Sequence, residues 1–317
     1  MTKSAACKSK LKRIRISQSR VYFAVEAGTD GEQRLMSGKR GGRPTAAFQG
    51  ELGAFSHTAA LKLLGPQTHP KPCPSFQDVF EALKNNKATH AVVPIENTLH
   101  GSILENYDNL LQYGFPIHGE TSVRIAHQLI TMPGTRFRDV KQAFSHPVAL
   151  NQCRNFFAEY KSIEASTFYD TAGSVKMLKE KQPPGSAAIA SEAAARFYGG
   201  VIVKRNIEDN RRNYTRFFLL TKQKNVVNHP ERIWKTSVVF STSNTPGALF
   251  KVMACLALRN LSLTKIESRP LVGRPWEYMF YVDFLGSTTD KVVQNALSNL
   301  SEVTGFSRVL GSYQPTI

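Results

Sequence analysis

The sequence has few cysteines and no long apolar run, and each shortage excludes a class of protein. Its four cysteines, Cys7, Cys73, Cys153 and Cys255, lie far apart and form no Cys-x-x-Cys pair. This spacing argues against a disulfide framework or a structural zinc site, and it fits a reducing compartment. The eight histidines show no metal-ligand spacing, so we predict no metal. No run of about 18 apolar residues occurs, so we predict no transmembrane helix and no membrane partner.

Acidic residues are absent from the first 25 positions. Residues 1–43 contain 11 Lys or Arg and three Asp or Glu, a net charge of +8 out of the total of +17. A basic, serine-bearing N-terminus without the apolar core of a secretory signal is typical of an organelle transit peptide. A disordered basic tail is the plainer alternative, and under either interpretation the folded chain begins near Pro44.

The remaining chain has the composition and patterning of a globular α/β protein. Its 317 residues suggest about two domains. Up to residue 221, short apolar strands alternate with amphipathic helices, which predicts a largely parallel sheet. Ser56 and Asp170 are predicted to cap two of the helices. Strands are expected at 45–50, 90–95, 186–190 and 215–221, and helices at 56–65, 102–111, 170–180 and 191–200.

A polar segment then interrupts this alternation and divides the chain. We expect a leader at 1–43, a first folded region at 44–222, a linker at 223–232 and a second region at 233–317. The last region has the order β-α-β-β-α-β, which is that of a ferredoxin-like split βαβ domain. A helix is expected at 246–260, with Pro246 near its start.

Small polar residues follow several of the expected strands. The segments are 50–56, 94–98, 170–173 and 190–191. In open α/β sheets, ligands bind beyond the carboxyl ends of strands, where helix N-termini favour anions. Each segment alone is more simply a helix cap. Their repetition in one region favours a ligand cleft.

The segment Asn213–Phe217 carries a different signal. A guanidinium such as that of Arg216 can bind a carboxylate with two hydrogen bonds. A neighbouring hydroxyl such as that of Thr215 can deliver a proton when it is held in place. An ordinary edge-strand arginine beside a threonine is an equally simple interpretation.

Together these segments resemble the prephenate/arogenate dehydratase family, and the last region resembles that family's ACT domain. The resemblance runs in order from about residue 45 to about residue 313, and the C-terminal part is most similar to plant and algal arogenate dehydratases, which are plastid proteins. It implies a two-lobed α/β catalytic domain, like a type II periplasmic binding protein, followed by a ferredoxin-like βαββαβ ACT domain. The segments that carry it are 48–56, 94–102, 145–153, 170–173, 187–191 and 213–217, and in the ACT region 246–270 and 277–284.

The resemblance implies a decarboxylative dehydration without a cofactor, which converts arogenate to phenylalanine or prephenate to phenylpyruvate. Thr215 would protonate the leaving hydroxyl, Arg216 would anchor a carboxylate or stabilise the adjacent geometry, and Phe217 would wall the ring. Glu96 would have a structural or orienting role, unless the ammonium group of arogenate reaches it. Further positions that match the family's substrate cleft are Ser56, Asn97, Thr98, Gly101, Ser102, Gln152, Thr171 and Ala172.

Three residues depart from the family's usual pattern. Thr98 stands where serine is usual, His100 occupies a loop where small residues are common, and Phe55 replaces a frequent tyrosine. These departures leave the expected activity intact, but they weaken any inference about which substrate is preferred.

In the C-terminal region the resemblance implies an allosteric phenylalanine site, feedback inhibition through a shifted oligomer equilibrium, and a homodimer or homotetramer. The implied effector residues are Asn244, Pro246, Gly247, Ala248 and Leu249, together with Glu267, Ser268, Arg269 and Pro270.

Two other classes of function stay open to test. A non-enzymatic solute-binding sensor would have the same two-lobed fold, so the fold alone does not exclude it. A nucleic-acid binder is suggested by the sequence pI of about 9.8. Because the basic excess is concentrated in the leader and no nucleic-acid motif occurs, we expect no nucleic-acid partner.

Overall fold

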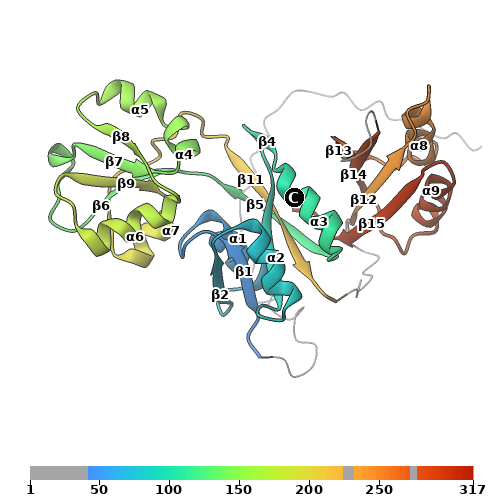
Figure 1. The fold of residues 1–317 in the computed structure, drawn as a ribbon, viewed down its shortest axis with the longest axis horizontal. Coiled ribbons are helices and arrows are strands. Elements are labelled where there is room, and N and C mark those ends of the chain that lie inside the picture. Colours follow the sequence, from blue (N-terminus) through green and yellow to red (C-terminus); the bar gives the residue numbers. More distant parts are fainter. Residues whose placement is uncertain (1–41, 224–231, 272–276, 317) are drawn as a thin grey trace, which may run out of the picture. The chain divides into compact units, whose positions relative to one another are not determined.

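The computed structural model describes residues 42–223, 232–271 and 277–316, which fold around three β-sheets (Figure 1). Most of the predicted leader and most of the predicted linker lie outside the described residues. The two predicted boundaries at these segments therefore stay predictions.

The first sheet, which we call lobe 1, has the order β2-β1-β3-β11-β5, with β4 paired to β3. β1 runs parallel to β2 and β3, whereas β11 is antiparallel to both of its neighbours. Helix α1 packs on one face, and α2 and α3 pack on the other. The elements are β1 (Thr45–Gln49), α1 (Phe55–Leu64), β2 (His69–Cys73), α2 (Phe76–Lys84), β3 (His90–Asn97), β4 (Gly101–Ser102), α3 (Leu104–Tyr113), β5 (Ile117–Arg124) and β11 (Tyr214–Thr221).

The second sheet, lobe 2, has the order β10-β6-β9-β7-β8. The chain enters it after β5 and returns to lobe 1 at β11 (Figure 1). β7 is parallel to β8 and β9, whereas β6 is antiparallel to β9 and β10. The elements are β6 (Gln128–Thr131), a 3₁₀ turn (Phe137–Asp139), β7 (Gln142–Ser145), α4 (Pro147–Asn151), α5 (Arg154–Glu159), β8 (Glu164–Thr167), α6 (Thr171–Lys181), β9 (Ser186–Ala190), α7 (Glu192–Tyr198) and β10 (Val201–Lys204).

The prediction of a largely parallel sheet was wrong, because both lobes have mixed sheets. The chain crosses between the lobes twice, and the returning strand β11 enters lobe 1 antiparallel to β3. Alternating strands and helices reveal βαβ units, but they carry no signal for a strand that returns from another lobe.

The third sheet, which we call the C-terminal module, is antiparallel throughout, in the order β13-β14-β12-β15. The predicted β-α-β-β-α-β order is confirmed. Helices α8 and α9 cover one face, and the other face packs Val239 and Tyr281 into the core of lobe 1. The elements are β12 (Lys235–Thr242), α8 (Ala248–Ala257), β13 (Leu263–Pro270), β14 (Tyr278–Leu285), α9 (Lys291–Glu302) and β15 (Phe306–Tyr313).

A proline lies inside the central strand β3, where it would normally interrupt the ladder. The pairing with β11 shifts register there: Arg216 lies opposite Glu96, but Phe217 lies opposite Pro94. The Pro94 carbonyl accepts a hydrogen bond from Asn106 Nδ2 at 2.7 Å. The bulge thus accommodates a residue without an N–H directly beside the Thr215–Phe217 segment.

Candidate active site

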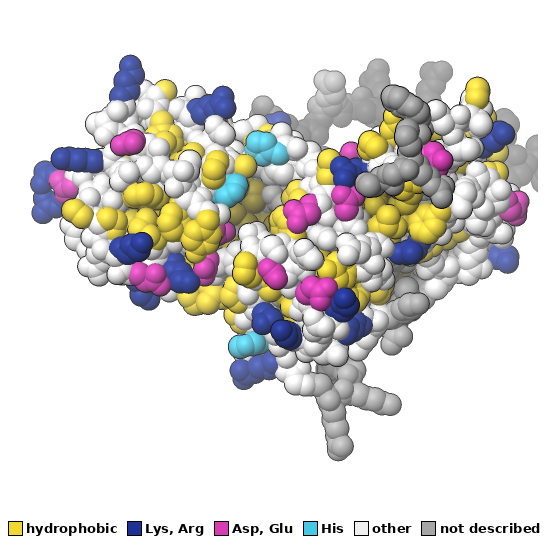
Figure 2. Space-filling model, in the orientation of Figure 1, with side chains coloured by type: hydrophobic (Ala, Val, Ile, Leu, Met, Phe, Trp, Pro, Cys, Tyr) yellow, Lys and Arg dark blue, Asp and Glu magenta, His cyan; other side chains and the backbone are white. Residues whose placement is uncertain are grey.

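A cleft of about 630 Å³ lies between the two lobes and receives residues from both. Figure 2 shows this face hollowed between the lobes, with apolar and histidine side chains around the hollow. Its lining is Gln49, Phe55, Ser56, Ser75, Phe76, Pro94, Asn97, His100, Ile103, Glu105, Ile125, His127, His146, Val148, Ala149, Gln152, Tyr169, Asp170, Thr171, Thr215 and Phe217.

The lobes approach each other closely at Gly53. This glycine has φ +86°, and a Cβ there would lie 2.5 Å from the Cα of Ala194 in lobe 2. Its carbonyl accepts a 2.6 Å hydrogen bond from the Ser191 hydroxyl. Only glycine tolerates both the backbone conformation and this proximity, so Gly53 allows α1 to begin against lobe 2.

Strand β11 turns alternate side chains to opposite faces of the lobe 1 sheet. Thr215 and Phe217 face the cleft and are 8% and 2% exposed. Arg216, between them, is not part of the cleft lining, and its guanidinium meets the C-terminal module. One three-residue segment therefore contributes to two separate environments.

The Thr215 hydroxyl is held by an amide cluster. Asn97 Nδ2 donates to Thr215 Oγ1 at 2.9 Å and to Asn213 Oδ1 at 2.7 Å. Asn97 Oδ1 accepts from the backbone N–H groups of Leu99 and His100 at 3.0 and 3.1 Å. Because the hydroxyl oxygen already accepts a hydrogen bond from Asn97, its own proton remains available to an acceptor in the cleft.

Arg216 is the centre of a buried ionic network. Its Nη2 pairs with Asp283 of β14, and its Nε lies 2.9 Å from Glu120 Oε2 of β5. Glu120 also pairs with Lys235 of β12 at 2.6 Å, and Asp283 accepts from the Ser237 hydroxyl at 2.5 Å. The carboxylates raise the pKa of Arg216, against the effect of burial, so the side chain stays cationic.

A second set of polar contacts joins the end of β3 and β4 to β13. Lys265 Nζ lies 3.2 Å from Glu96 Oε1 and 2.9 Å from Ser102 Oγ, and the Ser102 hydroxyl donates to Glu267 at 2.5 Å. Glu96 lies 3.5 Å from Arg216 and is not part of the cleft lining. The structure thus places an expected substrate residue, Ser102, against an expected effector residue, Glu267.

The structure brings only part of the expected substrate set into the cleft. Thr98 bonds the backbone of 212 and 214, Gly101 takes the left-handed φ of +76° in an exposed turn, and Ala172 is fully buried in lobe 2. The residues that line the cleft are Ser56, Asn97, Gln152, Thr171, Thr215 and Phe217, and those that do not are Thr98, Gly101, Ser102, Ala172 and Arg216.

Ser56 does not cap its helix, contrary to the sequence prediction. Helix α1 begins at Phe55, so Ser56 lies in its first turn, and the N-cap Ala54 supplies no side-chain acceptor. The prediction for Asp170 is confirmed, since its carboxylate accepts from Gly173 N at 2.7 Å at the start of α6. Burial raises the pKa of Asp170. The open N-terminus of α1 is therefore the better site for an anion.

Lysine and arginine are absent from the cleft lining among the described residues. An anion in the cleft would meet hydroxyls, amides, histidines and helix N–H groups, and the lining also contains the carboxylates of Glu105 and Asp170. The expected cation, Arg216, is already neutralised by carboxylates on the other face of the sheet.

Several lining residues were not predicted from the sequence, above all His127. It lies in the crossover between β5 and β6, its side chain is almost fully buried, and burial lowers its pKa. Its sequence neighbours are apolar or amide residues, and an isolated histidine in such a segment carries no pattern that indicates a site. Phe76, His146 and Tyr169 also line the cleft and were not predicted as site residues, although His146 lies in the segment 145–153 and Tyr169 directly precedes the segment 170–173.

The expected effector residues lie on two separated elements. Residues 244–249 form the loop and first turn of α8, which follows β12, and residues 267–270 end β13. β14 lies between β12 and β13, so the two strands are about 10 Å apart. Arg269 pairs with Asp108 of α3 at 2.6 Å.

Within the described ranges there is no cluster of three or more His, Cys, Asp or Glu that could hold a metal ion. In the same part of the chain, no helix combines the length and the apolar character needed to cross a bilayer.

The fold and the cleft place this chain in a known class. The family model described as "Prephenate dehydratase" matches residues 46–225, more than half of the sequence. The chain therefore belongs to the prephenate dehydratase family.

Particular relatives agree with this assignment. The chain is 42% identical over 290 residues to "Arogenate dehydratase/prephenate dehydratase 2, chloroplastic" of Arabidopsis thaliana, which covers 89% of this chain and 75% of the relative. A crystal structure of prephenate dehydratase in complex with L-Phe from Arthrobacter aurescens superposes with a TM-score of 0.77 at 30% identity, covering 85% of this chain and 89% of that one. A structure described as "GqqA- a novel type of quorum quenching acylases" gives a TM-score of 0.79 at 31% identity, covering 86% and 98% of the two chains. The predicted two-lobed domain with a C-terminal ACT domain is thereby confirmed.

Proposed function

We propose that the chain is a decarboxylating dehydratase that converts arogenate to phenylalanine in preference to converting prephenate to phenylpyruvate. The observation that carries the reaction is the Thr215 hydroxyl, which Asn97 holds at the surface of the cleft between the lobes. The hydroxyl does not distinguish the two substrates, and the similarity to plant arogenate dehydratases supports arogenate. Membership of the prephenate dehydratase family and the named plant relative support the reaction class.

In the proposed reaction, the bond between the ring carbon and its carboxylate breaks, and the electron pair enters the ring. The carbon–oxygen bond of the ring hydroxyl breaks at the same time, so the ring becomes aromatic and carbon dioxide is released. The leaving oxygen takes a proton from Thr215 and departs as water, and the Thr215 oxygen then takes a proton back from solvent water, which restores the acid for the next turnover. The Asn97 amide keeps the proton of Thr215 directed away from itself, which orients the acid.

Binding a substrate with two carboxylates without a lysine or arginine in the cleft lining requires other donors. The uncapped N-terminus of α1 and the amide of Gln152 supply them. Phe217 and Phe55 provide apolar walls for a ring. Because the reaction removes the charge of the ring carboxylate, weak anion binding on an apolar surface favours the transition state over the ground state.

The decisive experiment assays purified protein on arogenate and prephenate side by side. Turnover of arogenate with the higher kcat/KM is the expected result, and turnover of prephenate alone would make the arogenate assignment wrong. Thr215→Val, which keeps the side-chain shape, should lose turnover and retain substrate binding. A sensor of the same fold would bind ligand and show no turnover in either form.

We further propose that phenylalanine inhibits the enzyme by binding the C-terminal modules of a homodimer or homotetramer. The two effector motifs lie on strands separated by β14, so a second copy is the simplest way to complete the site. Phe250 in α8 is 74% exposed, and Leu258 at the C-terminal end of α8 is 82% exposed. Exposed apolar side chains of this size suit a face that another subunit covers. Equal affinity for phenylalanine in the active and inhibited forms would refute the mechanism.

The basic leader supports a plastid location, as does the chloroplastic relative in Arabidopsis thaliana. Fusion of residues 1–43 to a fluorescent protein should direct it into plastids of a plant cell. A diffuse cytosolic signal would contradict the proposal.

A further inference from the structure

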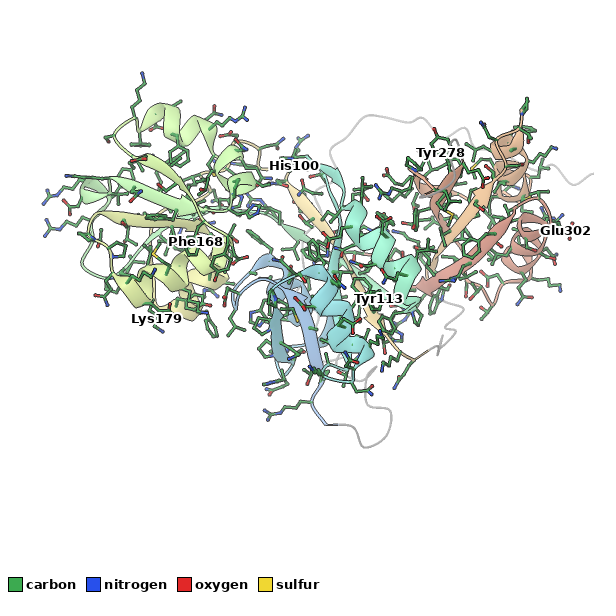
Figure 3. The ribbon with its side chains drawn as sticks, in the orientation of Figure 1. His100, Tyr113, Phe168, Lys179, Tyr278 and Glu302 are labelled. Carbon is green, nitrogen blue, oxygen red and sulfur yellow. The ribbon has the colours of Figure 1, made fainter. Side chains whose placement is uncertain are left out.

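Three side chains form a hydrogen-bonded chain across the cleft. His127 Nε2 lies 2.8 Å from Gln152 Oε1, and Gln152 Nε2 lies 2.8 Å from His100 Nε2. Gln152 ends α4 of lobe 2 and His127 directly precedes β6 of the same lobe, whereas His100 belongs to the turn between β3 and β4 of lobe 1. Figure 3 labels His100 at this turn. The Gln152 amide is therefore the middle member of a contact between the lobes.

The position of His127 is fixed from several directions. Its backbone N–H donates to Glu208 Oε2 at 2.9 Å, and its carbonyl accepts from Ile207 N at 2.9 Å. The edge of its ring meets Phe55, with ring centroids 5.8 Å apart. Its side chain is closed off from solvent, so the imidazole has little freedom to move away from Gln152.

The surroundings of His127 also determine which of its nitrogens carries the proton. Burial lowers its pKa and favours the neutral ring, which has one N–H and one bare nitrogen. Nδ1 is buried and has no hydrogen-bond partner. A buried N–H without an acceptor is rarer than a buried acceptor without a donor, so the proton belongs on Nε2, where it donates to Gln152 Oε1.

This proton sets the direction of the Gln152 amide. With Oε1 engaged by His127, the NH₂ group of Gln152 points toward His100, whose Nε2 accepts from it. His100 is exposed and held to Gln152 by one neutral hydrogen bond. A carboxylate is a stronger acceptor than a neutral imidazole, so an anionic ligand in the cleft can take its place.

We propose that His127 is a positioning residue that fixes the Gln152 amide with its N–H donors toward the substrate, and that His100 is a resting acceptor which a substrate carboxylate displaces. This inference rests on the proposed function, because that function supplies a carboxylate-bearing substrate. It assigns a role to His100, which distinguishes this chain from the usual family pattern.

The first test compares two substitutions of His127. His127→Phe keeps an aromatic ring against Phe55 but has no donor, and its KM should rise about tenfold, with a smaller change in kcat. His127→Gln restores an amide donor of similar reach and should recover most of the loss. Melting temperatures of both variants, and His69→Ala as an exposed histidine outside the cleft, control for general damage. A wild-type KM in His127→Phe, or equal losses in both variants, would overturn the positioning role.

The second test removes the resting acceptor. His100→Ala should lower KM by about two- to fivefold, because the substrate no longer competes with a neutral hydrogen bond. The gain should vanish in the His127→Phe background, where the amide is no longer oriented. A raised KM in His100→Ala would overturn displacement, since His100 would then help to bind the substrate.

The outcome for the wild-type protein separates this inference from the proposed function. If the wild type turns over neither arogenate nor prephenate, the proposed function fails. Calorimetric dissociation constants for the same two compounds and the same variants then test the inference directly. If neither compound binds the wild type, the inference fails as well.

Discussion

The two faces of strand β11 differ in kind, although their residues alternate along one short segment. The face toward the cleft presents Thr215 and Phe217 without a formal charge. The face toward the C-terminal module presents Arg216, which is surrounded by three carboxylates. The difference shows that neighbours in a motif need not share a site, because a strand turns successive side chains to opposite sides.

The peptide unit between Thr215 and Arg216 connects the cleft directly to the C-terminal module, because Thr215 lines the cleft and Arg216 pairs with Asp283. Any displacement of Asp283 acts on Arg216, and Arg216 is covalently adjacent to Thr215. This physical connection is short enough to transmit a change in the position of the module to the proposed acid. The following predictions test the division between the two faces, starting with the largest effect.

Removal of the hydroxyl on the cleft face should abolish most catalysis. Thr215→Val should lower kcat by about a thousandfold, as expected for the loss of a positioned acid. Thr215→Ser, which keeps the hydroxyl, should retain most of the activity. Steady-state kinetics measure both, and substrate binding by calorimetry should persist in Thr215→Val. Wild-type turnover in that variant would remove Thr215 from the mechanism.

Removal of the charge on the opposite face should act mainly on stability. Arg216→Met leaves the buried carboxylates of Glu120 and Asp283 without their main partner, and should lower the free energy of unfolding by about 3–5 kcal/mol. Urea denaturation measures the loss. Adding Asp283→Asn should restore part of it, so the double variant is less destabilised than the sum of the single ones. Additive losses would mean that the pair is not coupled.

A third prediction concerns the end of β11, away from both faces, where Thr221 pairs with His90. Burial, followed by the neighbouring His118, lowers the pKa of His90 from 6.5 to about 4. Between these values the unfolded chain binds a proton that the folded chain does not, so stability falls as the pH falls through this window. The loss reaches about 3 kcal/mol by pH 4. His90→Gln should lose less stability over the same window in urea denaturation, with unchanged activity at neutral pH.

A matched pair of substitutions tests whether the two faces of β11 differ in function. Phe217→Leu and Phe218→Leu each change a buried ring on adjacent positions, and each should cost about 1 kcal/mol of stability. Only Phe217→Leu should raise KM for the substrate, because only Phe217 lines the cleft. Equal KM changes would show that the two faces are not functionally distinct.

The smallest effect is expected at the contact between β4 and β13. Ser102→Ala removes the hydrogen bonds to Glu267 and Lys265 and should shift the phenylalanine concentration for half-inhibition several-fold. Inhibition curves measure the shift, and Ser298→Ala, at an exposed position of α9 outside the expected effector residues, provides a comparison. An unaltered curve for Ser102→Ala would exclude this contact from the response to phenylalanine.

Predictions from local sequence signals were reliable where a residue contacts groups only a few positions away in the chain. Asp170 and Ser191 cap α6 and α7 as their residue types predict, and the βαββαβ order follows from periodicity alone. Ser56 failed as a cap because α1 begins one residue earlier, at Phe55, with Ala54 as its N-cap beside the close approach of lobe 2 at Gly53. Steric contact with a distant segment leaves no trace in local composition.

The face of the sheet on which a side chain lies was harder to predict from the sequence. Thr215 and Arg216 are equally plausible site residues in the sequence, because nothing local says which side of β11 another sheet will cover. His127 gave no signal, since its function depends on Gln152 and on burial that only the fold creates. The departure at His100 was visible in the sequence, but its partner across the cleft was not.

The last described residues of the chain have a practical consequence for anyone who handles this protein. The Thr316 backbone N–H donates to the Glu120 carboxylate, and the Thr316 hydroxyl donates to the Glu120 backbone carbonyl. The same carboxylate meets Arg216 and Lys235. A purification tag fused at this end of the chain would add bulk close to Thr316 and therefore beside this carboxylate, one ion pair away from the Thr215–Phe217 segment.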